Sequence, residues 1–150
     1  MADCFKVEKR SEIMSHVKRA DTAVEIKVRS LLHRLGYRFR LHVSSLPGKP
    51  DIVLPRFKRV VFVHGCFWHR CPQHARTPKS RIDFWQNKLD SNARRDRSVA
   101  RKLRSMGWAV WTLWEHDFAR RRTDLITAKL GRRIRAREAK LLTQQKIPKR

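Results

Sequence analysis

The first regular pattern of hydrophobic positions in the chain predicts a helix that begins after Thr22. Apolar side chains recur there at the three- and four-residue spacing of one helix face, and Gly36 ends the pattern. Thr22 and Glu25 have the spacing of a capping box, in which two side chains satisfy free backbone N–H groups of the first turn. The predicted buried stripe comprises Val24, Val28, Leu31, Leu32 and Leu35.

After Gly36 the pattern becomes that of β-strands. Residues 37–43 alternate apolar and polar side chains, which predicts a half-buried strand. A Pro- and Gly-containing turn over residues 46–50 leads to a second short strand over residues 51–54, and residues 55–58 turn the chain again. Residues 59–64 are almost continuously apolar, which predicts a central strand buried on both faces.

The second half of the chain predicts a long helix, a further strand and a basic helix. The long helix runs from about Ile82 to Met106, residues 108–114 are strongly β-prone, and a weaker helical pattern begins near residue 119. The predicted stripe of the long helix comprises Trp85, Leu89, Val99, Leu103 and Met106, and that of the last helix comprises Leu125, Ile126, Leu130 and Ile134. This order predicts an α/β fold with a small mixed β-sheet flanked by helices.

The length of the chain predicts a single domain, and its charge predicts a polyanionic partner. A chain of 150 residues fits one domain, 1–150. Its 37 Lys+Arg and 13 Asp+Glu give a net charge of +24, which favours a nucleic-acid partner. We interpret residues 1–20 as a basic N-terminal arm and residues 119–150 as a basic helix and tail. Ribosomal and membrane-surface proteins share such a charge, so it indicates no activity.

The sequence also predicts where the protein works. No apolar run approaches the length of a membrane span, and the first residues lack the apolar core of a signal peptide. We therefore expect a cytoplasmic, nucleoid-associated monomer. The three cysteines are an odd number, which disfavours a disulfide framework in a reducing compartment.

Acidic residues are scarce, so Asp51 at the start of a predicted strand is a candidate magnesium ligand. Mg²⁺ prefers oxygen ligands and keeps waters for phosphate chemistry. Glu25 on the first helix could add a contact to metal-bound water. The alternative is structural: Asp51 caps a turn and Glu25 completes the capping box.

Residues 64–74 hold five of the ten Cys and His residues of the sequence. Cys66, Cys71 and His74 have the Cys-x4-Cys-x2-His spacing of a zinc site, and His116 after the last strand is the best-placed fourth ligand. Alternatively, His69 is a ligand, or the thiols are free. His69 is also a candidate general base, since an imidazole can accept a proton near neutral pH.

Bulky aromatic residues lie within this segment and after it. Adjacent Phe67 and Trp68 in an irregular loop favour a wedge between DNA base pairs, while Phe67 could instead cover the zinc site. For Trp85, a place on the apolar face of the long helix is at least as good an interpretation as a wedge.

These motifs together resemble the very short patch repair (Vsr) DNA mismatch endonuclease family. The resemblance covers about residues 8–118 and rests on residues 47–51, on 61–69 with Gly-Cys-Phe-Trp-His, on Phe84-Trp85 and on Trp114-Glu115. It implies a restriction-endonuclease-like core of the PD-(D/E)xK superfamily. It also implies an enzyme that nicks double-stranded DNA beside the thymine of T·G mismatches, which arise from deamination of 5-methylcytosine.

The resemblance further implies roles for individual residues. Asp51 and the main-chain carbonyl of Val63 are implied to bind catalytic Mg²⁺, Glu25 and His64 to hold metal-bound water, and His69 to act as general base. It implies structural Zn²⁺ on Cys66, Cys71, His74 and His116, and intercalation by Phe67, Trp68 and Trp85. The sequence departs from the family pattern at Cys71, His74 and His116, where His, Cys and Cys are expected, and at Val63, where a hydroxyl residue is expected. The lysine of the wider superfamily is absent after the central strand.

Two other functions stay open at this point. One is a zinc-containing nucleic-acid-binding protein without catalysis, in which Asp51 is structural. The other is a related nuclease without mismatch selectivity.

Overall fold

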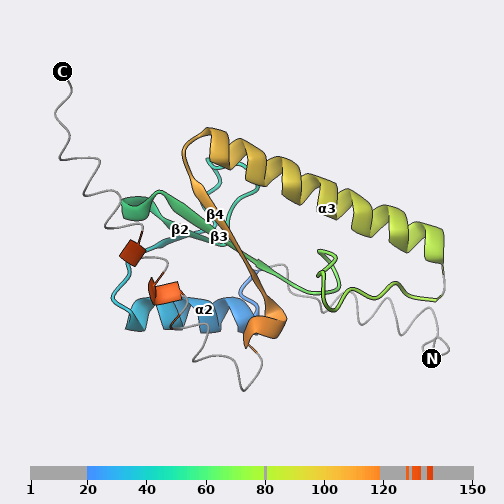
Figure 1. The fold of residues 1–150 in the computed structure, drawn as a ribbon, viewed down its shortest axis with the longest axis horizontal. Helices are drawn as coiled ribbons and strands as arrows, with labels where there is room; N and C mark the ends of the chain where they lie inside the picture. Colours follow the sequence, from blue (N-terminus) through green and yellow to red (C-terminus); the bar gives the residue numbers. More distant parts are fainter. Residues whose placement is uncertain (1–19, 80, 119–127, 129, 133–134, 137–150) are drawn as a thin grey trace.

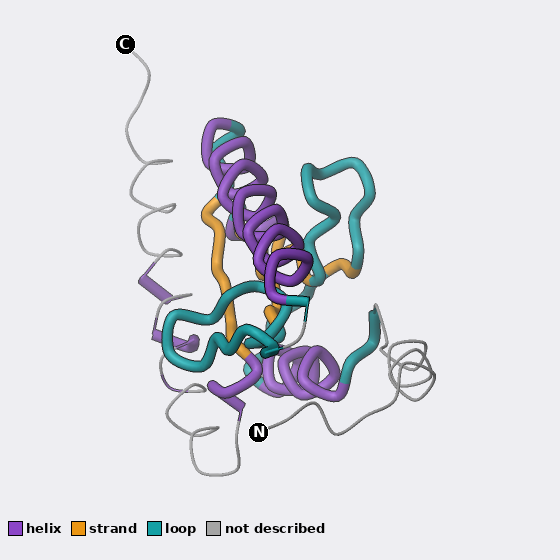
Figure 2. The backbone as a smooth tube through the Cα atoms, turned by 90° about the vertical axis from the view of Figure 1, so that its right-hand side faces the viewer, coloured by secondary structure: helices purple, strands orange, loops and turns teal. Residues whose placement is uncertain are grey.

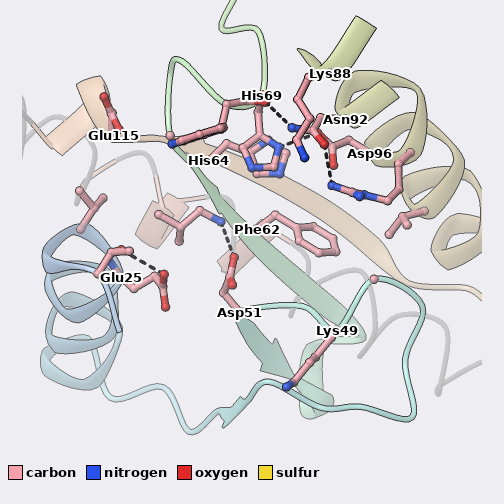
Figure 3. Close-up of a pocket in the computed structure, with 18 residues that line it drawn as sticks. Glu25, Lys49, Asp51, Phe62, His64, His69, Lys88, Asn92, Asp96 and Glu115 are labelled. Atoms are coloured by element: carbon pink, nitrogen blue, oxygen red, sulfur yellow. Dashed lines mark hydrogen bonds and ion pairs between the residues drawn. The ribbon is translucent and has the colours of Figure 1, made fainter. Parts of the chain in front are cut away.

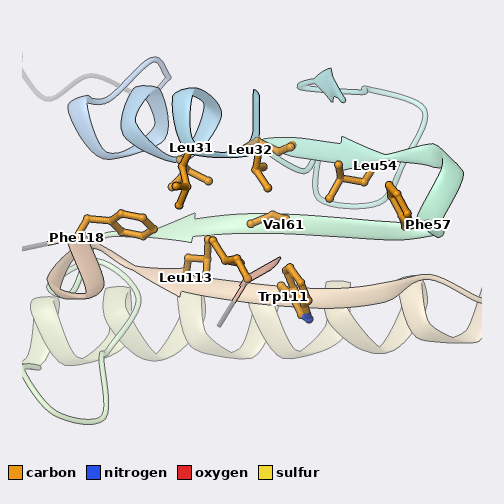
Figure 4. Packing of buried hydrophobic residues seen from close by; sticks show 11 residues of the cluster. Leu31, Leu32, Leu54, Phe57, Val61, Trp111, Leu113 and Phe118 are labelled. Atoms are coloured by element: carbon orange, nitrogen blue, oxygen red, sulfur yellow. The ribbon is translucent and has the colours of Figure 1, made fainter. Parts of the chain in front are cut away.

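In the described part of the chain, the fold has three layers, with a long helix covering each face of a four-stranded sheet (Figures 1 and 4). The computed structural model describes residues 20–79, 81–118, 128, 130–132 and 135–136. The elements are α2 (Ala23–Arg34), β1 (Arg40–Leu41), β2 (Ile52–Leu54), β3 (Arg59–His64), α3 (Ile82–Ser105) and β4 (Ala109–Trp114), with short 3₁₀ helices at Pro55–Phe57 and Glu115–Phe118. This is the small mixed sheet with flanking helices that the sequence predicts.

The sheet has the strand order β1-β2-β3-β4. The first three strands are antiparallel, whereas β3 and β4 are parallel, with Val61 opposite Trp111 and His64 opposite Trp114. A parallel pair needs a long crossover, and here the loop after β3 and the whole of α3 supply it. The predicted central position of residues 59–64 is therefore confirmed.

The larger core lies between α2 and the sheet. Val28, Leu31 and Leu32 of α2 pack against one face of β2, β3 and β4 (Figure 4). The other face carries a smaller cluster, in which Leu103 of α3 packs on Val53 and Val60. Successive strand residues alternate between these clusters, since Val60 and Val61 point to opposite faces.

Two predictions about these elements are wrong in detail. The strand predicted over residues 37–43 is reduced to Arg40–Leu41, because His42 has a positive φ of 46° that ends the extended backbone. Leu41 is 41% exposed although the alternation places it on the buried side. Met106 is 49% exposed because it caps α3 beyond its last turn instead of continuing the apolar stripe.

Most of the predicted basic segments lie outside the described residues. This applies to the arm predicted over residues 1–20, of which only Ala20 is described, and to most of residues 119–150. Leu130 is described: it is helical, as predicted, and packs into the core on the α2 side. Among the described residues, no helix is both long and apolar enough to cross a membrane. Figure 2 shows α3 and the loops from a second direction.

Gly48 fixes the loop that leads into β2 and Asp51. Its φ is +72°, and a Cβ atom on it would lie 2.4 Å from Cγ1 of Val99 on α3. Gly48→Ala therefore has to strain the backbone and also displace the side chain of Val99 on α3. We expect it to lower the free energy of unfolding by about 2–4 kcal/mol, measured by urea denaturation.

The matched control is Gly107→Ala. Gly107 has a similar φ of +81°, but a Cβ atom there would meet nothing within 4 Å. The drop in its free energy of unfolding should be confined to the backbone strain of about 1–2 kcal/mol. Equal drops in the two variants would show that the packing of the loop on α3 contributes nothing.

Candidate active site and metal centre

All four predicted catalytic residues line one cavity of about 950 Å³ between α2, the end of β3 and α3 (Figure 3). Glu25 comes from α2, Asp51 from the start of β2, His64 from the end of β3 and His69 from the following loop. These residues are far apart in sequence, and the fold brings them together. The cavity also receives Lys49, Lys88 and Arg95, so a polyanion entering it meets positive charge on two sides.

Asp51 directly precedes β2, and a hydrogen bond links its side chain to the end of β3. Its Oδ2 accepts a hydrogen bond of 2.7 Å from the backbone N–H of Val63. The side chain therefore does not cap its own turn, contrary to the structural alternative. Burial raises the pKa of Asp51 and the nearby Glu25 carboxylate adds to the rise, although the Val63 N–H opposes it. A cation beside the carboxylate would relieve this cost.

Glu25 completes the helix cap and also borders the cavity. Thr22 Oγ1 accepts from the Glu25 N–H at 3.3 Å, and Glu25 accepts from the Thr22 hydroxyl at 3.0 Å and from the Asp21 N–H at 3.1 Å. Arg29 donates to Oε2 at 2.9 Å. The structural and functional interpretations of Glu25 are therefore compatible, since one buried carboxylate serves the cap and faces the site (Figure 3).

His69 is held by a carboxylate that the sequence analysis missed. Its Nδ1 lies 2.6 Å from Oδ2 of Asp96 on α3, and its ring stacks on His64 with centroids 3.9 Å apart. Asp96 orients the imidazole so that Nδ1 carries the proton and Nε2 can accept one. His69 does not belong to the group formed by Cys66, Cys71, His74 and His116; its donor atoms lie instead with those of His64 and Asp96, in a second group that could hold a metal ion.

The surroundings of His64 and Asp96 shift their pKa values and so determine which of the two is charged. Burial lowers the pKa of His64 to about 4, and the neighbouring His69 acts in the same direction, so His64 is neutral at pH 7. Burial alone would raise the pKa of Asp96, but the hydrogen bond and charge of His69, with His64 and Arg95, outweigh it and lower that pKa. The site therefore combines an ionised carboxylate with a neutral imidazole.

Further residues of the cavity come from α3. Lys88, Asn92, Arg95 and Asp96 lie along one flank of this helix, and Asn92 donates to the backbone carbonyl of Trp68 at 3.0 Å. The scarcity of acidic residues that singles out Asp51 could also have drawn attention to Asp96. For Lys88 and Arg95 there was no such signal, because basic residues occur along the whole chain.

The four predicted zinc ligands form a second cluster next to this cavity. Potential ligand atoms of Cys66, Cys71, His74 and His116 all lie within 4.8 Å of one another. Nδ1 of His116 is 3.1 Å from Cys66 Sγ and 3.5 Å from Cys71 Sγ, and His74 Nδ1 is 3.7 Å from Cys71 Sγ. Neighbouring ligand atoms around tetrahedral zinc lie about 3.3–3.8 Å apart, so this donor set fits such an ion.

The surroundings of the cluster also fit a cation. Both thiols are buried, and burial raises the pKa of Cys66 to about 11. Asp117 places Oδ1 3.7 Å from Nε2 of His116, on the side of the ring away from the thiols. A carboxylate in this position orients a ligating imidazole and increases its basicity.

The three predicted intercalating residues form one aromatic cluster. Phe67 makes edge contacts with Trp68 and Trp85 at centroid distances of 5.0 and 5.4 Å, and the two tryptophans are 6.0 Å apart. All three are partly exposed, so Trp85 lies against the loop at the solvent boundary and not within the core. Phe84 extends the cluster and is 49% exposed.

A cavity lined by carboxylates, imidazoles and basic side chains in a strongly basic protein suits the binding of a polyanion. A family model described as DNA mismatch endonuclease Vsr matches residues 2–74. The type II nicking enzyme V.XorIIP of Xanthomonas oryzae pv. oryzae is 46% identical over 121 residues, 79% of this chain and 88% of its own. DNA mismatch endonuclease Vsr of Escherichia coli is 40% identical over 116 residues, 77% and 74% of the two chains. The type II nicking enzyme V.NaeI of Lentzea aerocolonigenes is 42% identical over 113 residues, which are 72% of this chain and 68% of its own.

The chain belongs to the Vsr DNA mismatch endonuclease family. Membership confirms the resemblance seen in the sequence and the prediction of a DNA endonuclease. It also implies the nuclease fold, which agrees with the mixed sheet and its flanking helices. Membership therefore favours an endonuclease over the alternative of a non-catalytic nucleic-acid-binding protein.

The lowered pKa of Asp96 predicts a specific acid sensitivity. Between the pKa of the folded protein and that of the unfolded chain, about 3.9, the unfolded chain binds more protons, so lower pH favours unfolding. The ionised carboxylate contributes its stability above the unfolded pKa and loses it as pH falls through the folded pKa. We expect the difference in free energy of unfolding between wild type and Asp96→Asn to shrink from pH 5 to pH 3. Urea denaturation at each pH measures it, and a constant difference would contradict the assignment.

Proposed function

We propose that this endonuclease nicks one strand of double-stranded DNA beside the thymine of a T·G mismatch, using Mg²⁺. The observation that supports it best is the meeting of Asp51, His69, Glu25 and His64 at one cavity. The relatives are named both as a mismatch endonuclease and as type II nicking enzymes, so a related nuclease without mismatch selectivity is the second candidate. We expect the enzyme to act as a monomer on DNA of the nucleoid.

Asp51 and the carbonyl of Val63 would hold Mg²⁺. Asp51 Oδ2 accepts the Val63 N–H, and within the described part of the chain Oδ1 has no hydrogen-bond partner. Burial raises the pKa of Asp51 more than the Val63 N–H, His42 and His69 lower it, so a cation beside this carboxylate would be favourable. When bound, the ion would stabilise negative charge building on the scissile phosphate. Glu25 and His64 border the same space and would orient water there.

His69 would act as the general base. A water oxygen attacks phosphorus, and its proton passes to Nε2 of His69, while Nδ1 stays hydrogen-bonded to Asp96. The bond from phosphorus to the 3′-oxygen breaks, which leaves 5′-phosphate and 3′-hydroxyl ends once the oxygen gains a proton. Lys88 and Arg95, which line the same cavity, would stabilise the charge on the phosphate.

The aromatic cluster would select the mismatch. A T·G pair is stacked and paired less strongly than a sound pair, so opening the step beside it costs less. Phe67, Trp68 and Trp85 would offset that cost by stacking on the opened bases. Trp68 and His69 are adjacent, and Asn92 and Asp96 hold both from α3, so the wedge and the base have a common support.

The Cys/His cluster would hold structural Zn²⁺. It ties the loop after β3 to the 3₁₀ helix after β4, and this loop carries both the wedge and the base. An irregular loop with few buried apolar residues has little else to hold it.

The substitution Asp51→Asn tests the magnesium proposal. Asparagine keeps an oxygen acceptor for the Val63 N–H but removes the charge, so the fold should persist. We expect nicking of a T·G duplex in Mg²⁺ to fall at least about 100-fold while binding to the same duplex persists, because a metal ligand typically supplies several kcal/mol of transition-state stabilisation. Gel analysis of the nicked strand and a binding titration measure the two effects.

Asp83→Asn is the matched control, because Asp83 is exposed and lines neither cavity. Its nicking rate should equal that of wild type. A wild-type rate in Asp51→Asn would overturn the role of Asp51. The same assay with a C·G duplex separates the two candidate functions: equal rates on the two duplexes would favour a nuclease without mismatch selectivity.

Cys66→Ser tests the zinc proposal. We expect the purified variant to contain less than about half an equivalent of Zn²⁺ and to give a lower folded yield, because a hydroxyl is a poor zinc ligand. Elemental analysis measures the metal. The same substitution at Cys4, which is not among the four predicted ligands, should leave the zinc content at one equivalent. Full zinc occupancy in Cys66→Ser would remove this residue from the site.

A further inference from the structure

A second cavity lies on the other side of the catalytic histidines. It has a volume of about 790 Å³ and is enclosed by α3 and the faces of β3 and β4 that α3 covers. His64, His69 and Asp96 line both cavities, so they form the wall between them. The nuclease chemistry proposed above uses only the first side of this wall.

The second cavity is bordered by four arginines. Arg97, Arg101 and Arg104 project from successive turns of α3, and Arg70 comes from the loop after β3. The two carboxylates of the cavity already have partners, since Asp90 pairs with Arg70 at 2.7 Å and Asp96 with His69. Over the described ranges of the chain, no carboxylate forms an ion pair with Arg97, Arg101 or Arg104.

This row of like charges is unfavourable in the protein by itself. Arginines at spacings of three and four residues on a helix repel one another, and none of these three is in an ion pair with an acidic residue of the described chain, although Asp90 and Asp96 line the same cavity. Ala93 and Ala100, the small residues of α3 that line the cavity, leave space between the helix and the strands. A basic, partly apolar groove of this kind suits a chain of phosphate groups with sugars between them.

We propose that this groove binds the phosphate backbone of the cleaved strand next to the scissile phosphate. The seven-residue separation of Arg97 and Arg104 corresponds to about 10 Å along the helix, which equals the axial rise of about three nucleotides. The strand would thus pass from the first cavity over the wall of histidines into the groove. This inference rests on the proposed function only for the position of the scissile phosphate in the first cavity.

The double substitution Arg101→Gln/Arg104→Gln tests the groove. Both residues are exposed, so the variant should fold. Binding of the full chain to a T·G duplex is measured without Mg²⁺, over a series of salt concentrations. We expect the affinity to fall at least about tenfold, and the slope of log affinity against log salt to become less steep by about 2, because each removed arginine leaves one phosphate without its cationic partner.

Arg94→Gln/Lys102→Gln is the matched control. It removes the same charge from the same helix, but neither residue lines the groove or the first cavity. Its salt slope should change by much less than that of the groove variant. Equal changes in the two variants would show a general effect of net charge and would overturn the proposal, as would unchanged binding by the groove variant. That last result would instead favour an acidic protein as the occupant.

Neutral methylphosphonates at single positions of the cleaved strand locate the phosphates that the groove binds. In wild type, one to three consecutive substitutions on one side of the nick should weaken binding, and the same substitutions should have no further effect in the groove variant. If every position weakens binding equally in both proteins, the strand does not occupy the groove. Because these are binding measurements, a failure of the proposed nicking activity would appear separately, as an uncut T·G duplex in Mg²⁺.

Discussion

The parallel pairing of β3 with β4 is the constraint on which both sites depend. The register places His64 opposite Trp114, so the two strands end together at one edge of the sheet. The loop after β3 and the 3₁₀ helix after β4 therefore start side by side, which brings Cys66 and His116 within 3.1 Å although they are 50 positions apart. The same edge carries His64 into the cavity. A slip of this register by one residue would turn His64 to the opposite face and separate the Cys/His cluster.

Helix α3 lies beside that edge and supplies residues to both cavities. The side chains of Leu89 and Leu103 are buried and anchor α3 on the protein, so the turns between them are a rigid support. Asn92 and Asp96, one turn apart, hold Trp68 and His69 through a carbonyl and an imidazole. The flank of Lys88 and Arg95 faces the first cavity, and the flank of Arg97, Arg101 and Arg104 faces the second. One helix thus positions the base, supports the aromatic cluster and presents charge on both sides of the histidine wall.

Much of this arrangement could be predicted from the sequence, for reasons that differ between residues. Periodicity located α2, β3 and α3 because their apolar faces are buried, and metal-ligand spacing identified the Cys/His cluster because zinc accepts few donor types. The strand over residues 37–43 was overestimated, since an alternating pattern does not reveal the positive φ of His42. Asp96 and the arginine groove could not be identified, because they depend on which flank of α3 faces the sheet. A helical pattern gives the buried stripe but not the neighbours of the polar residues beside it.

Acidic residues are scarce in this chain, so the few carboxylates near the cavity differ in their partners and in their roles. The net charge of +24 favours ionised carboxylates in general, yet Asp51 has a raised pKa because of its burial. Asp90 and Asp96 are in ion pairs with Arg70 and His69, and Glu25 with Arg29. Asp51 has only a backbone N–H as its bonded partner in the described chain. Among the carboxylates of the cavity that are not fully exposed, Asp51 is therefore the one for which the described chain provides no ion pair, and this keeps it available for a cation.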